Sequence, residues 1–319
     1  MNAALALSYG TPDSVVFGQA PSPRLKPGQV LVAVRAAAVT RGDARILMAS
    51  APAGLALLLR LTFGIFRPRQ PIPGMLFCGT VETESPGLPA GTRVVGNTGT
   101  AMGAHAEYVA ISPDRLVPVP DGLDDCAAAS LLFGGLAAAD FLIDKARVRK
   151  GTRLLINGAT GEVGCAALQI ARHLGAETTA VCREENHALA RKLGAFAAHD
   201  YRAGPPQGTW DVVLDIAGTL PWPLARNCVA PGGILLPVTA TLSGILGALL
   251  RPHRSEGRRI FANTTTDGPD DIRRVLALYA EGALRPVFGG IFPFPQIRSA
   301  YVMAGTGHKR GSVVVRVAE

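Results

Sequence analysis

The sequence lacks the cysteine patterns that build disulfide scaffolds or structural zinc sites. Its 319 residues include only five cysteines, and an odd number of widely separated cysteines is typical of reduced thiols in a cytoplasmic protein. A structural zinc site would need closely spaced cysteines, such as a C-x-x-C pair, and the sequence has none. The five are Cys78, Cys126, Cys165, Cys182 and Cys228.

The sequence also lacks a run that is long and apolar enough to cross a bilayer. Its most apolar window, Ala53–Phe66, is interrupted by Arg60 and is too short for a membrane span. The first residues do not combine a charged start with a long apolar run, so no targeting segment is expected. These absences predict that the protein has no membrane partner.

A concentrated basic surface is missing as well, although the formal net charge is +8. The cations are scattered along the chain and are not interleaved with aromatic residues, which argues against a nucleic-acid partner. We expect this charge to lie on a solvated surface that helps to attract an anionic cofactor. With 48% hydrophobic and 18% charged residues, the chain is globular, and its length favours two domains.

The sequence does contain a buried strand that runs into a glycine-rich turn and then a helix. Leu154–Ile156 is apolar throughout, as expected for a central parallel strand. The turn Ala159–Gly164 is an A-x-G-x-x-G form of the dinucleotide fingerprint. In it, Gly161 allows the backbone to approach a diphosphate, and Gly164 allows the helix to pack closely on the strand. The free N–H groups at the start of the helix attract the phosphates.

The segments after this turn repeat the strand–helix–strand rhythm of a nucleotide-binding fold. Gly175 ends the first helix, a second strand is expected at Thr178–Cys182, and a third at Trp210–Asp215, before Ala217 and Gly218. The repetition separates this pattern from an isolated glycine turn. The apolar positions of the first helix recur on one face; they are Val163, Ala167, Ile170 and Leu174.

The end of the second strand is where a dinucleotide fold distinguishes NADP from NAD. Enzymes that use NAD usually have an acid there, which binds the ribose hydroxyls, and enzymes that use NADP have a cation near the 2′-phosphate. Here Cys182 is followed by Arg183 and then by Glu184. Arg183 favours NADPH, because a guanidinium pairs well with phosphate. An inward-pointing Glu184 would instead bind a ribose, so NADH stays open as an alternative.

The flanks of this nucleotide-binding section are β-rich. Short strands separated by Gly and Pro are typical of a closed or rolled β domain, and a last strand near the C-terminus returns to it. The expected strands are Val30–Ala36, Gly79–Glu84, Arg93–Gly96, Ala106–Ile111, Leu116–Val119 and Ser312–Val317.

Five stretches, spread over nearly the whole chain, carry a family resemblance. They are Lys26–Val32 (K-P-G-Q-V-L-V), Val39–Asp43 (V-T-R-G-D), Gly103–Tyr108 (G-A-H-A-E-Y), Asn157–Gly161 (N-G-A-T-G) and Gly307–Gly311 (G-H-K-R-G). In this order they resemble the motifs of medium-chain dehydrogenases/reductases, in the zinc-free quinone oxidoreductase (zeta-crystallin-like) branch. Because the match keeps its order along the chain, it is more specific than any single motif.

The resemblance implies an α/β fold in which a Rossmann-type, doubly wound parallel sheet is inserted into a GroES-like β-rich catalytic domain. The expected divisions are 1–122 for the GroES-like domain, 123–263 for the dinucleotide-binding domain and 264–319 for the return. A homodimer is compatible with the resemblance. The cofactor-binding residues are then expected to be Asn157, Gly158, Ala159, Thr160, Gly161, Glu162, Val163, Gly164, Cys182, Arg183, Asn186, Tyr201, Ala217, Gly218, Val238, Thr239, Ala262, Asn263 and Lys309.

The resemblance also allows a test for catalytic zinc. Zinc alcohol dehydrogenases place a Cys in the first cleft turn and a His–Glu pair in the next. Here the first turn has Thr40, and the second, Gly74–Cys78, has neither His nor Glu. Cys78 alone cannot form a tetrahedral site. We therefore expect no zinc.

Without a metal, the chemistry expected from the resemblance is hydride transfer from NADPH to a small apolar quinone or to a C=C bond conjugated to a carbonyl. The residues that would assist in the substrate cleft are candidates by motif position only: Thr40, Asp43, Arg45, Asn97 and His105. Asp43 can equally bind turn amides, and His105 can be structural. In some members of the family, a tyrosine after the first cleft turn is a candidate acid. No tyrosine occurs here between Arg41 and Phe66, so solvent can deliver the proton that follows the hydride.

Two other functions stay open from the sequence. One is a non-catalytic NADPH-binding protein, crystallin-like or redox-sensing, and the other is carbonyl reduction of the alcohol dehydrogenase type. The stretch 47–72 is also unusual, because apolar residues occur almost all round its expected helix. That pattern predicts a helix that packs under another element or faces an apolar substrate.

Overall fold

The computed structural model describes residues 1–50, 54–239, 250, 255–261, 265–307 and 309–318. Within these residues, a six-stranded sheet has the order β10-β9-β8-β11-β12-β13, with every neighbouring pair parallel. Numbered along the chain, this is 3-2-1-4-5-6, the order of a doubly wound dinucleotide-binding sheet. Its strands are β8 (Arg153–Asn157), β9 (Glu177–Cys182), β10 (Ala197–Asp200), β11 (Trp210–Asp215), β12 (Val229–Pro237) and β13 (Arg259–Ile260).

The centre of this sheet is the strand that the sequence places before the glycine turn. Leu154, Leu155 and Ile156 of β8 are fully buried between β9 and β11, as an all-apolar strand with two covered faces requires. Helix α4 (Glu162–His173) follows the turn, with ten consecutive buried residues. Gly175 ends it with φ +73°. The next helix is α5 (His187–Leu193).

The β-rich unit is a second sheet with the order β14-β15-β3-β4-β5-β7, to which β6 adds by pairing with β3. The predicted strand at Gly79–Glu84 is displaced: the observed strand is Leu76–Val81, because the chain turns at Ser85–Leu88 and Glu82–Glu84 lead into that turn. The strands of this sheet are β3 (Val30–Ala38), β4 (Leu76–Val81), β5 (Arg93–Asn97), β6 (Tyr108–Ile111), β7 (Leu116–Pro118), β14 (Phe288–Pro293) and β15 (Ser312–Arg316).

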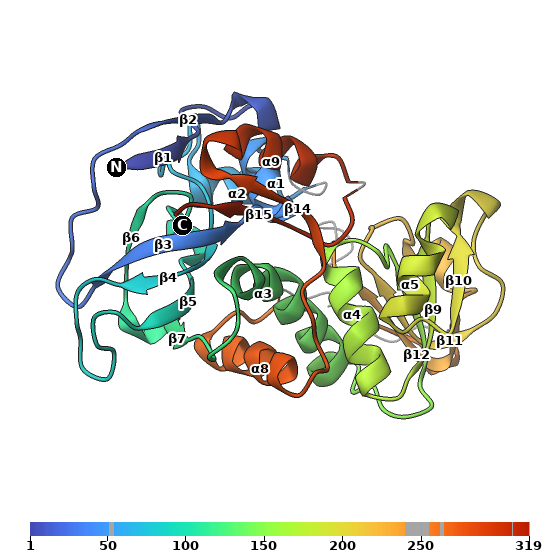
Figure 1. Cartoon of the computed structure of the whole chain (residues 1–319). Helices are drawn as coiled ribbons and strands as arrows, with labels where there is room; N and C mark the ends of the chain where they lie inside the picture. The colour runs from blue at the N-terminus through green and yellow to red at the C-terminus, as the bar shows by residue number, and fades with distance from the viewer. Residues whose placement is uncertain (51–53, 240–249, 251–254, 262–264, 308, 319) are drawn as a thin grey trace.

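The C-terminal segment returns to this β-rich unit. Strand β15 pairs antiparallel with β3, and Figure 1 shows both chain ends on the β-rich side, with the nucleotide-binding sheet on the other. The expected fold, a parallel sheet inserted into a β-rich unit, is therefore confirmed. The remaining elements are β1 (Asn2–Leu5), β2 (Val16–Gln19), α1 (Arg41–Leu47), α6 (Trp222–Ala225), α8 (Pro269–Ala280) and α9 (Ile297–Gly305).

A long apolar helix joins the two units. Helix α3 (Asp125–Ala139) continues through a π-helical turn to Lys145, giving 21 residues whose most apolar window has a mean hydropathy of 1.9. It is long and apolar enough to span a bilayer, but 89% of that window is buried inside the protein. Helix α3 packs on β3, β4 and β15 on one side and on α4 and α8 on the other. Its apolarity is that of a core helix.

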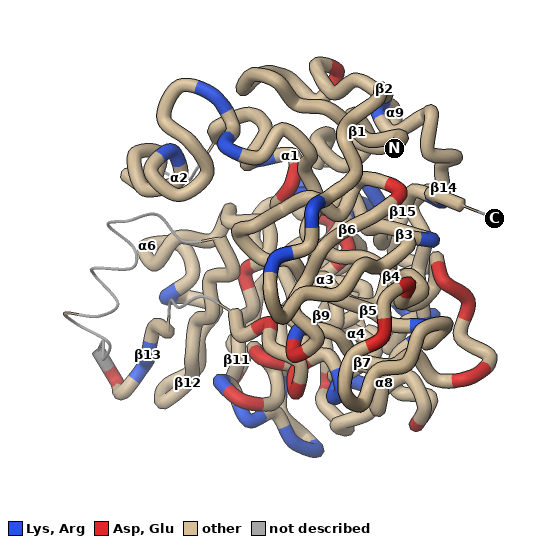
Figure 2. The backbone as a smooth tube through the Cα atoms, turned by 90° about the vertical axis from the view of Figure 1, so that its left-hand side faces the viewer, with Lys and Arg blue, Asp and Glu red and all other residues tan. Residues whose placement is uncertain are grey.

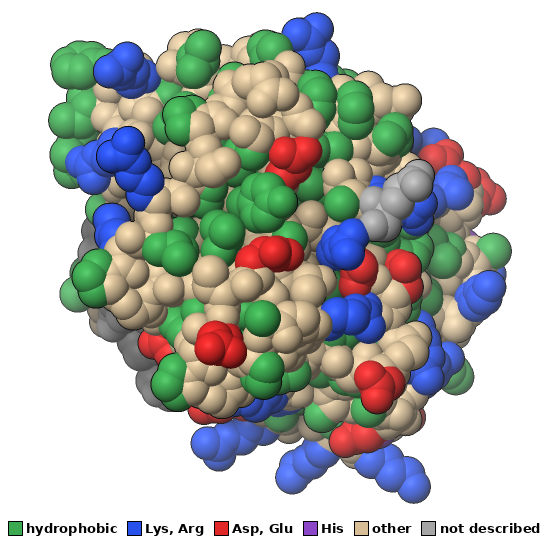
Figure 3. Space-filling model, turned by 60° about the vertical axis from the view of Figure 1, so that its left-hand side comes forward, with side chains coloured by type: hydrophobic (Ala, Val, Ile, Leu, Met, Phe, Trp, Pro, Cys, Tyr) green, Lys and Arg blue, Asp and Glu red, His purple; other side chains and the backbone are tan. Residues whose placement is uncertain are grey.

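The predicted role of the stretch 47–72 is wrong in part. Among its described residues, Leu47 ends α1 and Ala56–Phe63 forms α2. None of the residues of α2 is buried, so α2 does not pack under another element. Figure 2 shows α2 at the edge of the molecule beside blue cationic segments. Figure 3 shows the molecule turned in the same direction as Figure 2, but less far. Green hydrophobic and blue cationic side chains gather at its upper left, the side on which Figure 2 shows α2.

Candidate functional site

A cleft of about 1560 Å³ lies between the β-rich unit and the carboxyl edge of the parallel sheet. Ligands of open α/β sheets bind outside the carboxyl ends of the strands, and this volume exceeds that of an ordinary small-molecule pocket. The cleft can therefore hold a dinucleotide together with a second, smaller molecule. Its walls come from the turn after β8, the ends of β9, β11 and β12, helices α1 and α3, and strands β4 and β5.

The turn after β8 is shaped for close approach of a ligand. Gly161 begins α4, and a Cβ built on it would meet nothing nearer than the Gly158 oxygen at 3.6 Å. A Cβ on Gly164 would lie only 2.3 Å from that same oxygen. Gly161 is therefore open toward the cleft, whereas Gly164 is needed for packing, as the fingerprint predicts. The N–H groups of the first turn of α4 are free to bind phosphate oxygens.

Hydrogen bonds of Asn157 and Asp215 join the ends of β8 and β11 at the cleft. The Asn157 amide donates to Asp215 Oδ1 at 2.7 Å and to Thr219 Oγ1 at 2.8 Å. Asp215 also accepts the backbone N–H groups of Gly218 and Leu220, each at 2.9 Å. Asn157, which was predicted to bind the cofactor, lines the cleft, and its amide nitrogen is committed to joining the ends of β8 and β11.

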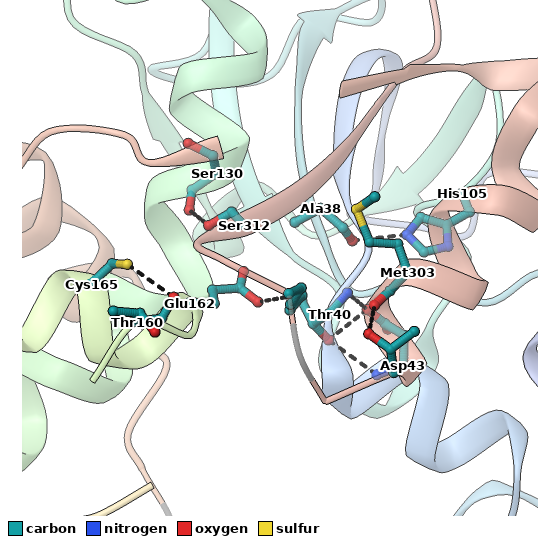
Figure 4. A network of polar contacts seen from close by, with 12 residues as sticks. Ala38, Thr40, Asp43, His105, Ser130, Thr160, Glu162, Cys165, Met303 and Ser312 are labelled. Carbon is teal, nitrogen blue, oxygen red and sulfur yellow. Dashed lines mark hydrogen bonds and ion pairs between the residues drawn. The ribbon is translucent and has the colours of Figure 1, made fainter. Parts of the chain in front are cut away.

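An ion pair fastens the C-terminal return to the phosphate turn. Lys309 Nζ lies 2.7 Å from Glu162 Oε2, and both side chains are almost fully buried. Burial raises the pKa of Glu162, and Lys309 opposes that rise. Beside this pair, the Gly311 N–H donates to the Thr160 oxygen at 3.0 Å. Figure 4 shows Glu162 with Thr160 and Ser312 nearby. Lys309 and Glu162, both predicted to bind the cofactor, thus line the cleft but are paired with each other.

Arg183 and Glu184, at the end of β9, differ in their position relative to the cleft. Arg183 lines the cleft and donates from Nε to the Tyr201 hydroxyl at 2.9 Å; Tyr201 lines the cleft too. Glu184 is exposed and is not among the residues that line the cleft. Arg202 is engaged with Asp200 at 2.6 Å. Arg183, whose Nη1 also lies 3.5 Å from Glu185 Oε1, is thus the one of these two arginines that lines the cleft.

The other predicted cofactor residues fall into three groups. Asn186 lines the cleft, and its buried Oδ1 has no hydrogen-bond partner among the described residues. Gly158, Thr160, Val163, Cys182, Ala217, Val238 and Thr239 also line it. Ala159 and Gly164 are buried behind this surface, and Gly218 is exposed outside it in a turn with φ +74°. The predictions for Ala262 and Asn263, and His308 in the last motif, lie outside the described residues.

Two of the predicted substrate-cleft residues instead form the cap of helix α1. Thr40 Oγ1 accepts the Asp43 N–H at 3.0 Å, and Asp43 Oδ2 accepts the Thr40 N–H at 2.8 Å, which is a capping box. Both residues are fully buried and neither lines the cleft. Their placement corrects the prediction and matches the alternative that Asp43 binds turn amides (Figure 4).

His105 is also structural. It is fully buried, with Nε2 3.0 Å from the Ala38 oxygen and Nδ1 3.0 Å from the Tyr301 hydroxyl. Because a carbonyl oxygen only accepts, Nε2 carries the proton, and Nδ1 accepts from Tyr301. Burial lowers the pKa of His105. A Cβ on Gly74 would meet the imidazole at 2.4 Å, so the ring fills the space under that turn and does not reach the cleft.

Two predicted polar residues do line the substrate side. Arg45 lies 3.4 Å from the Thr239 hydroxyl across the cleft. Its pKa is lowered, chiefly by burial and then by the neighbouring Arg41. Asn97 donates to Asp267 Oδ2 at 2.8 Å. Sequence analysis missed Arg41, which also lines the cleft although it stands between Thr40 and Asp43 in the quoted motif.

An apolar wall completes the substrate side, and sequence analysis missed most of it. Its side chains come from α3 and the π-helical turn after it, from the first residue of β4 and the residue before it, and from the residue before α2. They are Phe133, Leu136, Phe141, Leu76, Met75 and Leu55. A helix that is apolar all round gives no sign of which residues face a cleft, so α3 offered no signal. The wall suits an apolar ring or chain next to two guanidinium groups.

The donor set for a metal is poor. No group of three His, Cys, Asp or Glu side chains that could hold a metal ion occurs among the described residues. Cys78 is fully buried, with its Sγ 3.4 Å from Asp125 Oδ1. Burial and the neighbouring Asp125 raise the pKa of the Cys78 thiol, which disfavours the thiolate that a metal needs. The side chains at the zinc positions of the dehydrogenase pattern therefore do not suit zinc.

Two family models match most of the chain between them. One, described as the alcohol dehydrogenase GroES-like domain, matches residues 26–121. The other, described as zinc-binding dehydrogenase, matches residues 191–315. The first covers β3 to β7, and the second runs from α5 to β15.

Curated relatives and solved structures agree with these matches. The mitochondrial NAD(P)H oxidoreductase RTN4IP1 of Drosophila melanogaster is 28% identical over 78% of the chain and 69% of its own length. Mycoketide-CoA synthase of Mycobacterium tuberculosis is 32% identical over 82% of the chain, which spans only 6% of that synthase. The quinone oxidoreductase of Coxiella burnetii has 25% identity and a TM-score of 0.88, over 100% and 99% of the two chains. That of Thermus thermophilus, described also in complex with NADPH, has 26% identity and a TM-score of 0.77, over 99% and 100%.

Proposed function

The chain belongs to the medium-chain dehydrogenase/reductase superfamily and matches its quinone oxidoreductase branch, and from this premise we propose that it reduces a quinone or an α,β-unsaturated carbonyl with hydride from NADPH, without zinc. One observation carries the proposal. A single cleft joins an open glycine turn, with Arg183 beyond it, to an apolar wall that carries Arg41 and Arg45. The first end suits a phosphorylated dinucleotide and the second an apolar acceptor.

The dinucleotide end fits NADPH by its own geometry. The open face of Gly161 and the N–H groups of α4 would hold the diphosphate. Arg183, with Tyr201 beside it, would pair with the 2′-phosphate. The buried Asn186 Oδ1, which has no partner among the described residues, is an acceptor for a ribose hydroxyl. When bound, NADPH supplies the hydride.

At the other end, the residues of the chain orient the acceptor and stabilise charge. The apolar wall excludes water and receives the ring or carbon chain of the substrate. When hydride reaches the β carbon of an enone, or a quinone, negative charge develops on the carbonyl oxygen. Arg45 and Arg41 would stabilise that charge, because a guanidinium cannot be deprotonated in proteins and donates in a fixed geometry. A solvent proton then completes the product, since the buried His105 and Asp43 do not reach the cleft.

The experiment that tests the proposal is NADPH oxidation with a panel of quinones, enones and aldehydes, before and after prolonged chelation. We expect turnover with quinones or enones, no loss on chelation and no stoichiometric zinc in the purified protein. Turnover with aldehydes alone, lost when one zinc per chain is removed, would mean alcohol dehydrogenase chemistry. Cofactor fluorescence that shifts without any turnover would mean a non-catalytic NADPH-binding protein.

A further inference from the structure

Helix α2 and the loop after it form an exposed apolar surface. Phe66 is 91% exposed, Leu57 70%, Leu58 60%, and Leu61 and Ile65 48% each. We call these five residues the α2 surface. Large side chains exposed singly are ordinary, but a contiguous group marks a contact site. No residue of α2 is buried, so packing against the described part of the chain does not explain its apolar side chains.

The loop that carries Ile65 and Phe66 is held by specific contacts. The Tyr9 hydroxyl donates to the Gly64 oxygen at 2.6 Å. Arg60 donates to the Ile65 oxygen at 2.7 Å, and its guanidinium lies 5.2 Å from the centre of the Tyr9 ring. The inner side of the segment is therefore anchored, and its apolar side chains are presented outward.

The charged side chains of the segment that carries the α2 surface have one sign. No Asp or Glu occurs in the sequence between Asp43 and Glu82, whereas Arg60, Arg67 and Arg69 lie within or just after α2. Arg67 and Arg69 are exposed. At the upper left of Figure 3, on the side where α2 lies, blue cationic side chains but no red anionic ones stand among the green hydrophobic ones. An occupant of this surface must be apolar in part and negative in part.

We propose that the α2 surface docks on an anionic lipid bilayer. Leucines and a phenylalanine that project from a short helix and its loop insert at the boundary between headgroups and acyl chains, while flanking arginines bind anionic headgroups. A second copy bound through the same surface would bring its arginines against each other. The expectation that the protein has no membrane partner was based on bilayer-spanning segments, and surface docking needs none.

Docking through the α2 surface would bring the cleft close to the membrane. Leu55, the residue immediately before α2, lines the cleft, so a docked molecule holds its cleft beside the lipid. An apolar quinone dissolves in that lipid. Delivery of the acceptor from the membrane rests on the proposed quinone reduction, whereas docking itself does not.

Vesicle co-sedimentation of the full chain tests docking. Vesicles of phosphatidylcholine alone are compared with vesicles of equal parts phosphatidylcholine and phosphatidylglycerol. We expect binding to the anionic vesicles that added salt weakens, and at least about tenfold weaker binding for Leu57→Ser/Leu58→Ser and for Phe66→Ser. Phe196→Ser is the matched control, because Phe196 is 82% exposed in the nucleotide-binding unit and should bind as the wild type does.

The charge part of the surface has its own pair of variants. Arg67→Glu/Arg69→Glu should abolish the preference for anionic vesicles, whereas Arg191→Glu/Lys192→Glu, on exposed residues of α5, should keep it. Equal binding of the wild type to both vesicles, or unchanged binding of Leu57→Ser/Leu58→Ser, would overturn the proposal. So would an α2 variant that turns a dimer into monomers in sedimentation velocity while the wild type ignores vesicles. An acidic protein that binds through α2 in the absence of any vesicle affinity would overturn it too.

Activity separates this proposal from the proposed function. None of the substituted residues lines the cleft, so every variant should reduce a water-soluble quinone at the wild-type rate without vesicles. With a long-chain quinone embedded in anionic vesicles, Leu57→Ser/Leu58→Ser, Phe66→Ser and Arg67→Glu/Arg69→Glu should lose rate, whereas Phe196→Ser and Arg191→Glu/Lys192→Glu should keep it. A wild-type protein that binds these vesicles but reduces no quinone would support docking and contradict the proposed quinone reduction.

Discussion

The two ends of the cleft differ in whether the residues predicted from sequence motifs line it. At the dinucleotide end, the residues that the fingerprint singles out surround the cleft: Gly161 is open to it, and Arg183 lines it. At the substrate end, three of the five predicted side chains, Thr40, Asp43 and His105, are buried behind the cleft. The residues that line it there include Arg41, which lies between two of them.

This difference has a physical origin. A phosphate-binding turn is specified by its backbone, because only glycine leaves room where the ligand or the helix must come close. The T-x-x-D pattern of Thr40 and Asp43 is ambiguous, since the same residues that can face a substrate also cap a helix. In a cap the polar side chains point back to the chain, and the residue between them points outward.

The largest effect is expected at the dinucleotide end. Gly161→Val should weaken NADPH binding by about 100-fold or more, because its side chain would occupy the space where the diphosphate meets the backbone. The matched control is Gly268→Val. Gly268 precedes α8 with φ −75° and ψ 175°, and Gly161 has φ −74° and ψ −179°. Titration calorimetry of both folded variants is decisive, and unchanged affinity in Gly161→Val would exclude the fingerprint as the binding site.

The next effect is expected at the substrate end. Arg45→Met should lower kcat by roughly 100- to 1000-fold, about 2.7–4 kcal/mol, the usual cost of removing one donor to a developing oxyanion. Steady-state kinetics with the best quinone or enone measures this loss. Arg298→Met is the control, since that exposed arginine also makes one long bond, of 3.4 Å, but to the Val15 oxygen outside the cleft. Equal kinetics in the two variants would remove Arg45 from the mechanism.

A cofactor preference should depend on Arg183. Arg183→Ala should weaken NADPH binding by about 1.5–3 kcal/mol and change NADH binding little, because only NADPH offers the 2′-phosphate. Arg202→Ala should preserve the ratio, as Arg202 is engaged with Asp200 and does not line the cleft. Fluorescence titration with both cofactors checks this. Equal losses for NADPH and NADH would show that Arg183 does not bind the phosphate.

The capping residues should affect stability and not chemistry. Thr40→Ala should lower the free energy of unfolding by about 1 kcal/mol, the usual cost of losing an N-cap. Its kcat should stay within about twofold of the wild type, because Thr40 is outside the cleft. Urea unfolding and kinetics on the same preparation separate the two effects. A large fall in kcat with unchanged stability would restore Thr40 to the catalytic residues.

The smallest effect is a pH dependence of stability at His105. Because burial lowers its pKa below 6.5, the unfolded chain binds a proton more readily than the folded one. This contribution to stability is complete above pH 6.5 and falls as the pH drops from 6.5 toward the lower pKa, by at most about 1.4 kcal/mol per pH unit. Thermal unfolding between these values should therefore depend less on pH in His105→Gln. Identical profiles would show that His105 is protonated in the fold.

The sequence predicted the fold more fully than the cleft. The apolar strand Leu154–Ile156, the turn at Gly161 and the repeated strands define the parallel sheet through local patterns. Strand β4 was displaced because no local pattern marks where Val81 ends the strand. The apolar wall could not be predicted, since Phe133 and Phe141 belong to a helix that is apolar all round. Which side chains meet across a cleft depends on tertiary packing that no local spacing encodes.

The most direct test of the central claim is the destination of the hydride. NADPH deuterated at the transferred position should be oxidised by the chelator-treated protein in the presence of an enone, and NMR of the product locates the label. Label on the carbon β to the carbonyl is the predicted result, and a quinone that is reduced without label on any carbon agrees with it. Label on the carbonyl carbon would contradict it and mean alcohol dehydrogenase chemistry.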